Sequence, residues 1–336
     1  MTSTRRTGGS GTRARRVMWA AQAAAAAIAS VSALSGFHLP LREIDPRGVD
    51  AASAGTEIIG IRTFTAPPGI RVEADLEYGV REDGTMLTLD VCTPPAAALA
   101  DEPLPAVVSI HGGSWARGDK ANADWRGTCL WLASEGFVAA SVNYRLVPGA
   151  VFPAAIDDVA LAVEWLRAPE QAARFGMDPD RIGAFGGSAG GSLAALLGTT
   201  GDGPLETGSR VAAVAELSGP VGLGASELVA DGASDWLHRI IGDYLGCEPG
   251  ASDEQCPQAT EASAGTHADP SDPPFFIGHS ESEVVPLGQS QRLASTLTTA
   301  GVAVELAIVP GGDHSIGLLD EAMRARVAAF LHAHLD

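Results

Sequence analysis

Basic side chains are scarce in this chain of 336 residues. Lysine and arginine together number 22 against 41 acidic residues, which gives a formal net charge of −19, and Lys120 is the single lysine. A protein that binds nucleic acid needs a basic face to neutralise the phosphates. The charge balance therefore argues against a nucleic-acid partner and favours an acidic, well-solvated surface.

Aromatic residues make up 5% of the chain and cysteine occurs four times, whereas 46% of the residues are hydrophobic. This composition suits one large α/β domain or at most two small domains. No cysteine pair has the spacing of a zinc or redox motif, so the cysteines predict no metal site. Cys247 and Cys256 bracket a polar loop and are predicted to form a disulfide, which would stabilise the fold by about 2.7 kcal/mol. Cys92 and Cys129 lie in apolar patterns and are predicted to be buried free thiols.

The N-terminal segment has no acidic residue over positions 1–16 but carries five arginines, and an alanine-rich run without charge follows over 17–37. This arrangement is typical of a signal peptide, with Val31-Ser32-Ala33 as a cleavage site and the Arg15-Arg16 pair as a sign of twin-arginine export. The run is also just long enough to cross a bilayer as an uncleaved anchor. We therefore expect a secreted or cell-envelope protein, with 1–37 as signal peptide or membrane anchor.

Residues 38–69 show no clear period and are predicted to form a linker or a strap. From residue 70 onward, strand and helix patterns alternate, and the first two strands are expected to be half-exposed and joined by a hairpin at Asp83-Gly84. Alternation of this kind predicts a mostly parallel, doubly wound α/β sheet over 70–336. The segment 219–272 interrupts the alternation and is expected to form a small cap over the carboxyl ends of the strands. We expect strands at 72–78, 86–91, 106–110, 138–142, 182–185, 211–217, 275–278 and 302–309, and helices at 153–166, 192–197, 286–300 and 318–334.

A glycine cluster around Ser188 separates an apolar strand pattern from an apolar helix pattern. The motif Gly186-x-Ser188-x-Gly190 places a serine on a sharp strand-to-helix turn, where the glycines remove side chains that would collide with nearby backbone. The N–H groups at the start of the helix, including that of Ala189, would face negative charge that develops beside the serine. The same pentapeptide also occurs in ordinary tight turns, so other parts of the chain are needed to distinguish a nucleophilic serine from such a turn.

A nucleophilic serine needs a base and an acid that orients the base. His314 lies in a glycine-rich loop after the last predicted strand, where a base is expected. Glu281 and Glu283 follow the preceding strand and are both candidates for the acid. Asp313 adjoins the base in sequence, but neighbours in a loop usually point apart.

Donors for an oxyanion are expected from the segment His111-Gly112-Gly113-Ser114-Trp115, which directly follows the first buried strand. In isolation this glycine pair fits a plain turn equally well. The order nucleophile, acid and base, with an HGG loop upstream, is much more specific than any one part.

Taken as a set, these motifs resemble the α/β-hydrolases of the esterase/lipase group with HGG-type oxyanion loops, close to the hormone-sensitive-lipase-like and feruloyl-esterase-like carboxylesterases. The resemblance spans about residues 70–335. The matching segments are 111–120, 143–146, 152–158, 178–182 and 186–191, with 284–286 and 313–314.

The resemblance implies a carboxylesterase or lipase-like enzyme, without a cofactor, that acts on short-to-medium acyl esters through Ser188 and His314. Glu283 stands where the family usually has aspartate. The oxyanion donors implied are the N–H groups of Gly113, Ser114 and Ala189, with Gly112 in the same loop. Two alternatives stay open: a secreted peptidase or amidase on the same fold, and a non-catalytic hydrolase-like binding protein.

Overall fold

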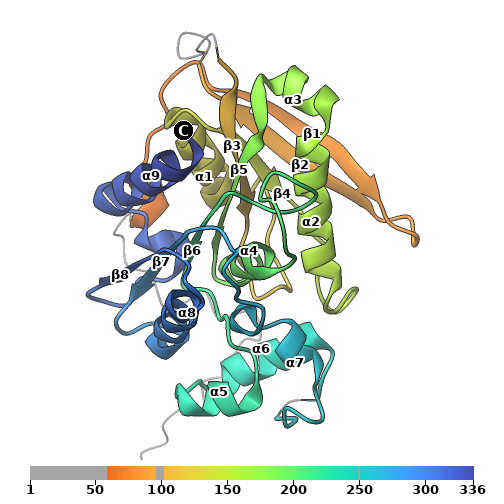
Figure 1. Ribbon diagram of the computed structural model, residues 1–336, viewed down its shortest axis with the longest axis vertical. Helices are drawn as coiled ribbons and strands as arrows, with labels where there is room; N and C mark the ends of the chain where they lie inside the picture. Colours follow the sequence, from red (N-terminus) through yellow and green to blue (C-terminus); the bar gives the residue numbers. More distant parts are fainter. Residues whose placement is uncertain (1–58, 96–101, 249) are drawn as a thin grey trace, which may run out of the picture. The chain divides into compact units, whose positions relative to one another are not determined.

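A computed structural model describes residues 59–95, 102–248 and 250–336 (Figure 1). The predicted signal peptide or anchor at 1–37 and the first part of the predicted strap, 38–58, lie outside the described residues. Among the helices of the described ranges, none is long and apolar enough to cross a membrane.

Eight strands of the described chain form one sheet in the spatial order β1-β2-β4-β3-β5-β6-β7-β8 (Figure 1). β2 runs antiparallel to both of its neighbours, and the other neighbouring pairs are parallel. This confirms the predicted doubly wound, mostly parallel sheet. The strands are β1 (Arg71–Val80), β2 (Met86–Thr93), β3 (Leu104–Ile110), β4 (Val138–Val142), β5 (Met177–Gly187), β6 (Ala213–Leu217), β7 (Phe275–Ser280) and β8 (Val304–Val309).

Helices cover both faces of the sheet (Figure 1). One face carries α1 (Ala123–Ser134) and α9 (Glu321–Leu335), and the other carries α2 (Ala154–Arg167), α3 (Pro169–Phe175), α4 (Ala189–Thr199) and α8 (Leu287–Ala300). Each central strand contributes to both apolar cores: Val107 packs on the side of α1 and α9, whereas Ala106 and Val108 pack on the opposite side. Because both faces are buried, these strands appear in the sequence as continuous apolar runs.

β2 differs from its prediction, because it is buried along most of its length instead of half-exposed. Asp90, which the alternating pattern places on a solvated face, has no exposed surface. Its carboxylate accepts a hydrogen bond of 2.7 Å from Lys120 Nζ and pairs with Arg126. Lys120, the single lysine, is 3% exposed and also pairs with Asp75. A polar residue in a strand can thus be buried when an ion pair compensates its charge.

Two disulfides link the four cysteines. The bond between Cys247 and Cys256 agrees with the prediction. The bond between Cys92 in β2 and Cys129 in α1 shows that the prediction of free thiols was wrong. α1 packs directly on β2 and β4, which brings the two Cα atoms to 5.9 Å. Each apolar pattern indicated burial correctly but carried no information on the partner.

The segment between β6 and β7 forms α5 (Ala225–Ala230), α6 (Asp235–Leu245) and α7 (Gln258–Glu261), which lie together beyond one end of the sheet (Figure 1). α6 begins after Ser234, whose hydroxyl accepts a hydrogen bond of 3.3 Å from Leu237 N, and it ends at Gly246 with φ +70°. Both are ordinary helix caps. We refer to residues 219–272 as the cap.

The last part of the predicted strap contains a single 3-10 turn, Gly60–Thr63. It packs against a second 3-10 turn, Ser315–Leu318, and against α1. The approach is close: a Cβ on Gly60 would lie 2.3 Å from the carbonyl oxygen of Ile316. An ion pair of 2.8 Å between Arg62 and Asp124 holds the turn on α1. Residues 59–69 therefore contact the segment that directly follows His314.

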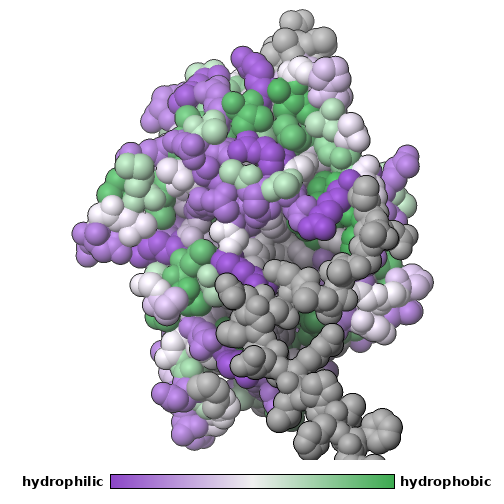
Figure 2. Space-filling model, turned by 180° about the vertical axis from the view of Figure 1, so that it is seen from behind, coloured by the Kyte–Doolittle hydropathy of each residue, from purple (hydrophilic) through white to green (hydrophobic). Residues whose placement is uncertain are grey.

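The surface in Figure 2 mixes hydrophilic residues with smaller hydrophobic areas wherever grey atoms do not cover it. The large hydrophobic side chains that are exposed in the described chain come from separate elements, such as Val80 in β1, Val229 in α5 and Ile308 in β8. Scattered apolar side chains of this kind are usual for a globular protein.

Candidate active site

Ser188 lies at the turn between β5 and α4, with φ +56° and ψ −126°. Few residues other than glycine adopt such a conformation, and strain of this kind collects at functional positions. The flanking glycines are required by close contacts: a Cβ on Gly186 would lie 2.1 Å from the carbonyl oxygen of Gly190, and a Cβ on Gly190 would lie 2.0 Å from that of Ile110. The sharp turn predicted from the motif is therefore present. Its serine is partly exposed, whereas the residues on both sides are buried.

The segment after β3 lies directly against this turn. A Cβ on Gly112 would be 2.7 Å from the carbonyl oxygen of Gly187 and 3.1 Å from Cβ of Ser188. The chain then turns through three successive positive φ angles at Gly113, Ser114 and Trp115. The structure thus brings the predicted oxyanion segment and the predicted nucleophile together. Ala189 is the first residue of α4, and the first N–H groups of a helix have no partner within it.

Aromatic side chains fix this segment from two sides. The ring of Tyr144 stacks on that of His111 at 4.3 Å, and its hydroxyl donates a hydrogen bond of 2.7 Å to the carbonyl oxygen of His111. Burial lowers the pKa of His111, which favours the neutral form of the ring. Trp115 stacks on Tyr244 of α6, with ring centroids 4.2 Å apart and an angle of 8°. The cap is therefore packed onto the segment that carries Gly113 and Ser114.

His314 follows β8 in a loop whose backbone is held on both sides. Ser280 donates a hydrogen bond of 2.6 Å to the carbonyl oxygen of Asp313, and Ser218 accepts one of 3.0 Å from Ser315 N. A Cβ on Gly187 would lie 2.2 Å from Oγ of Ser315. The residue after His314 thus contacts the residue before Ser188.

Glu283 is the acid that the structure places on His314. Its Oε2 pairs with Nδ1 of His314, and its side chain has no exposed surface. Burial acts to raise the pKa of Glu283, but the contacts with His279 and His314 outweigh burial and lower that pKa to about 2. The other candidates, Glu281 and Asp313, are exposed.

Two buried groups near Glu283 were given no catalytic role by the sequence prediction, which placed His279 near the site as a structural residue and did not consider Glu216. His279, at the end of β7, lies with Nε2 3.0 Å from Oε1 of Glu283, and neither side chain is exposed. Glu216 in β6 is also unexposed; its Oε2 accepts a hydrogen bond of 2.8 Å from Gly219 N, and its Oε1 has no partner. Burial raises the pKa of Glu216 to about 7. The sequence signal for His279 was its position at the end of a buried strand, four residues before Glu283.

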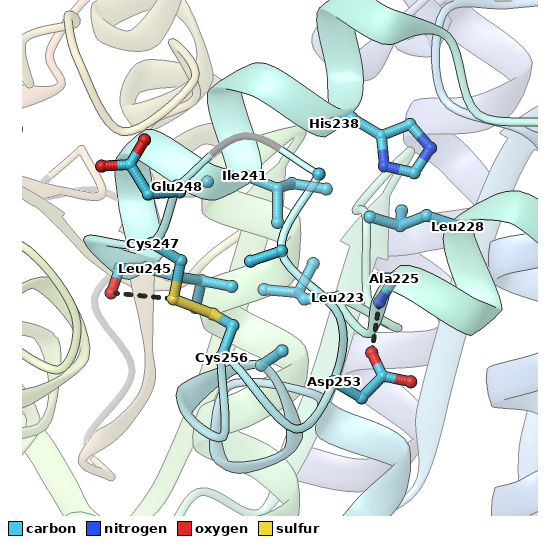
Figure 3. A pocket seen from close by; sticks show the side chains of 14 residues that line it. Leu223, Ala225, Leu228, His238, Ile241, Leu245, Cys247, Glu248, Asp253 and Cys256 are labelled. Carbon is cyan, nitrogen blue, oxygen red and sulfur yellow. Dashed lines mark hydrogen bonds between the residues drawn. A yellow bond between two sulfur atoms is a disulfide. The ribbon is translucent and has the colours of Figure 1, made fainter. Parts of the chain in front are cut away.

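The cap contains a hollow of its own (Figure 3). Figure 3 shows Leu228 and His238 on one side of this hollow and the disulfide between Cys247 and Cys256 on the other. Ser188, Glu283 and His314 do not line it. None of the three predicted catalytic residues therefore belongs to this hollow.

Comparisons with known proteins point to one family. The model of the BD-FAE family matches residues 89–297. Carboxylesterase NlhH of Mycobacterium tuberculosis is 32% identical over 274 residues, which are 78% of this chain and 80% of that protein. Esterase LipQ of the same organism is 30% identical over 265 residues. This match covers 76% of the chain but only 60% of LipQ, so the chain spans less than two thirds of that relative.

Solved structures agree with this result. A truncated carbohydrate esterase from gut microbiota superposes with a TM-score of 0.64 at 26% identity, over 80% of this chain and 99% of that one. Esterase 2 of Thermogutta terrifontis, phosphoramylated by tabun, gives 0.62 at 25% identity, over 79% and 95%. The prediction of an α/β-hydrolase of the esterase group is confirmed, and the chain belongs to the BD-FAE family.

Proposed function

We propose that this protein is a serine carboxylesterase that cleaves short-to-medium acyl esters by two-step acyl transfer. The observation that carries this proposal is the contact between the buried carboxylate of Glu283 and Nδ1 of His314. A carboxylate on Nδ1 fixes the tautomer in which Nε2 is free to accept a proton. The contacts of Gly112 with Ser188 and of Gly187 with Ser315 support a common site for the three loops.

In the first step, Ser188 Oγ attacks the ester carbonyl while His314 Nε2 takes its proton. Glu283 orients the imidazole and stabilises its charged form; with a pKa of about 2 this carboxylate is ionised throughout the neutral range. The N–H groups of Gly113, Ser114 and Ala189 stabilise the tetrahedral oxyanion. His314 then protonates the departing alcohol. In the second step, water activated by His314 releases the acid from Ser188.

The acyl range is proposed from similar proteins. Structures of Thermogutta terrifontis esterase 2 with propionate and with butyrate bound are each 26% identical to this chain, with TM-scores of 0.61 and 0.62. Their short acids support small acyl groups as substrates here.

We also place the protein outside the cytoplasm. The two disulfides and the arginine-rich, then apolar N-terminal pattern support export. Cell fractions in which the protein is cytoplasmic and its cysteines are reduced would contradict this placement.

The test is the hydrolysis of p-nitrophenyl acetate, butyrate and octanoate by the wild type and Ser188→Ala. We expect activity on the short esters, a fall in kcat of roughly 10⁴-fold or more in Ser188→Ala, and fluorophosphonate labelling of the wild type alone. Ser192→Ala, one turn further along α4, is the matched control and should keep its activity. Absence of turnover on every ester, without labelling, would refute the enzyme; faster turnover of aminoacyl p-nitroanilides would favour a peptidase.

A further inference from the structure

The carboxylate of Glu283 lies between two histidines. Oε2 pairs with His314, while Oε1 lies 3.0 Å from Nε2 of His279. We propose that His279 is a positioning residue that holds Oε1 of Glu283 in place, so that Oε2 is kept in line with His314. This inference rests on the proposed function, since it gives a task to a residue beside the proposed triad.

The ring of His279 is fixed independently of Glu283. Its Nδ1 lies 2.8 Å from the hydroxyl of Ser290 in α8, and its Nε2 donates a hydrogen bond of 2.9 Å to the carbonyl oxygen of Val285. The N–H is aligned with Val285 and not with Oε1, which has no hydrogen-bond partner. The contact between His279 and Glu283 is therefore an electrostatic one, made by a ring that backbone and helix hold in position.

A fixed partner for the carboxylate of Glu283 matters because glutamate is longer than the aspartate that the family usually has at this position. The extra methylene adds one rotatable bond between the backbone and the carboxylate, and its freedom would let the carboxylate turn away from His314. Both side chains are fully buried, so water does not compete for Oε1. Attraction between opposite charges is strong in such surroundings.

The neighbouring charges favour the cationic form of His279. Burial alone would lower the pKa of this imidazole, but the contact with Glu283, the hydrogen bond to Val285 and the negative charge of Glu216 raise it above its ordinary value. These groups approach His279 from the loop after β7 and from β6, while α8 contributes the neutral hydroxyl of Ser290. When His279 is protonated, its positive charge offsets that of the buried carboxylate that the proposed mechanism needs.

The experiment is a double-mutant cycle in the full-length protein with p-nitrophenyl acetate as substrate. His279→Gln is compared with the wild type, and the same change is made in Glu283→Gln; His334→Gln, at an exposed position of α9, is the control. We expect His279→Gln to lower kcat roughly 10- to 100-fold with little change in KM, because a displaced catalytic group costs rate and not binding. In Glu283→Gln the same change should alter kcat by less than about threefold.

The pH profile supplies a second readout. His279→Gln removes the positive charge of the protonated imidazole, which makes protonation of the neighbouring triad easier, so the acid limb of kcat/KM should move to higher pH. An equal fall in kcat in both backgrounds, or a kcat within twofold of the wild type, would overturn the proposal.

If His279→Gln does not fold, Ser290→Ala takes its place in the cycle, because it removes the hydroxyl that holds His279 Nδ1. A fall in kcat that occurs when Glu283 is present but not in the Glu283→Gln background supports the proposal, and any other pattern overturns it. Failure of the proposed function is recognised separately, by a Ser188→Ala variant that keeps its activity.

Discussion

Glu216 offers a direct test of the charge balance around the site. Its side chain is fully buried in β6, and burial raises its pKa to about 7 from an ordinary value of 4.5. The folded protein therefore binds this proton more tightly than the unfolded chain does. The stability that the neutral carboxyl contributes is fully present below pH 4.5 and is lost as the pH rises through about 7.

The perturbation is Glu216→Gln, which keeps the shape and the acceptor for Gly219 N but does not ionise. A difference of two to three pKa units corresponds to roughly 3 kcal/mol, of which a part is offset because Glu216 also stabilises the charge on His279. At pH 5 we expect the free energy of unfolding of the variant to equal or fall below that of the wild type. Between pH 5 and pH 8 the difference between the two free energies should shift by about 1–3 kcal/mol in favour of the variant.

The assay is unfolding by guanidinium chloride at a series of pH values, followed by circular dichroism with the disulfides intact. Glu305→Gln in β8 is the control, because that glutamate is exposed and pairs with Arg326 on the surface. If the stability difference between Glu216→Gln and the wild type were the same at pH 5 and pH 8, the raised pKa of Glu216 would be refuted.

Two further predictions concern the oxyanion segment and the second disulfide. In Gly112→Ala the new Cβ would meet the carbonyl oxygen of Gly187 at 2.7 Å, so we expect kcat/KM to fall roughly 10²-fold. The control is Gly265→Ala, where a Cβ meets nothing closer than 3.8 Å and activity should be kept. A fully active Gly112→Ala would contradict the predicted oxyanion segment. The paired change Cys92→Ser and Cys129→Ser opens a loop of 37 residues and should lower the free energy of unfolding by about 4 kcal/mol on the loop-entropy estimate. The measurement is unfolding in guanidinium chloride. An unchanged unfolding midpoint would show that the disulfide does not stabilise the fold.

The parts of the site that could be predicted from the sequence are those whose determinants lie close together along the chain. The turn at Ser188 depends on the glycines two positions away on each side, so a pentapeptide contains most of its requirements. The sheet was predictable for a related reason: burial on both faces makes each parallel strand a continuous apolar run. Alternation of such runs with helix patterns then limits the fold to a few classes.

Features that depend on which distant segments meet could not be predicted. The patterns around Cys92 and Cys129 indicated burial but not that α1 would place one sulfur beside the other. Asp90 occupied a polar position of an alternating strand, and the approach of Lys120 and Arg126 explains its burial. Lys120 ends the matching segment 111–120, but nothing in the sequence indicated its contacts. Its 3% exposure and two carboxylate partners make it an anchor of the segment that leads from Gly113 to α1.

The acid of the proposed triad shows where sequence reasoning stops. Glu281, Glu283 and Asp313 all lie in the loops after β7 and β8, and sequence distance from His314 ranks them wrongly, because the nearest residue, Asp313, is exposed. Backbone hydrogen bonds join the loop after β7 to the end of β8 and to the loop that follows it, from Glu281 N to the carbonyl oxygen of Val309 and from Ser282 N to that of Gly311. In this arrangement the side chain of Glu283 is the buried one. Once Glu283 is buried there, its charge needs a partner on each oxygen, and His314 can serve only one of them. The second histidine, His279, therefore follows from the burial of the acid and not from any motif that surrounds the serine.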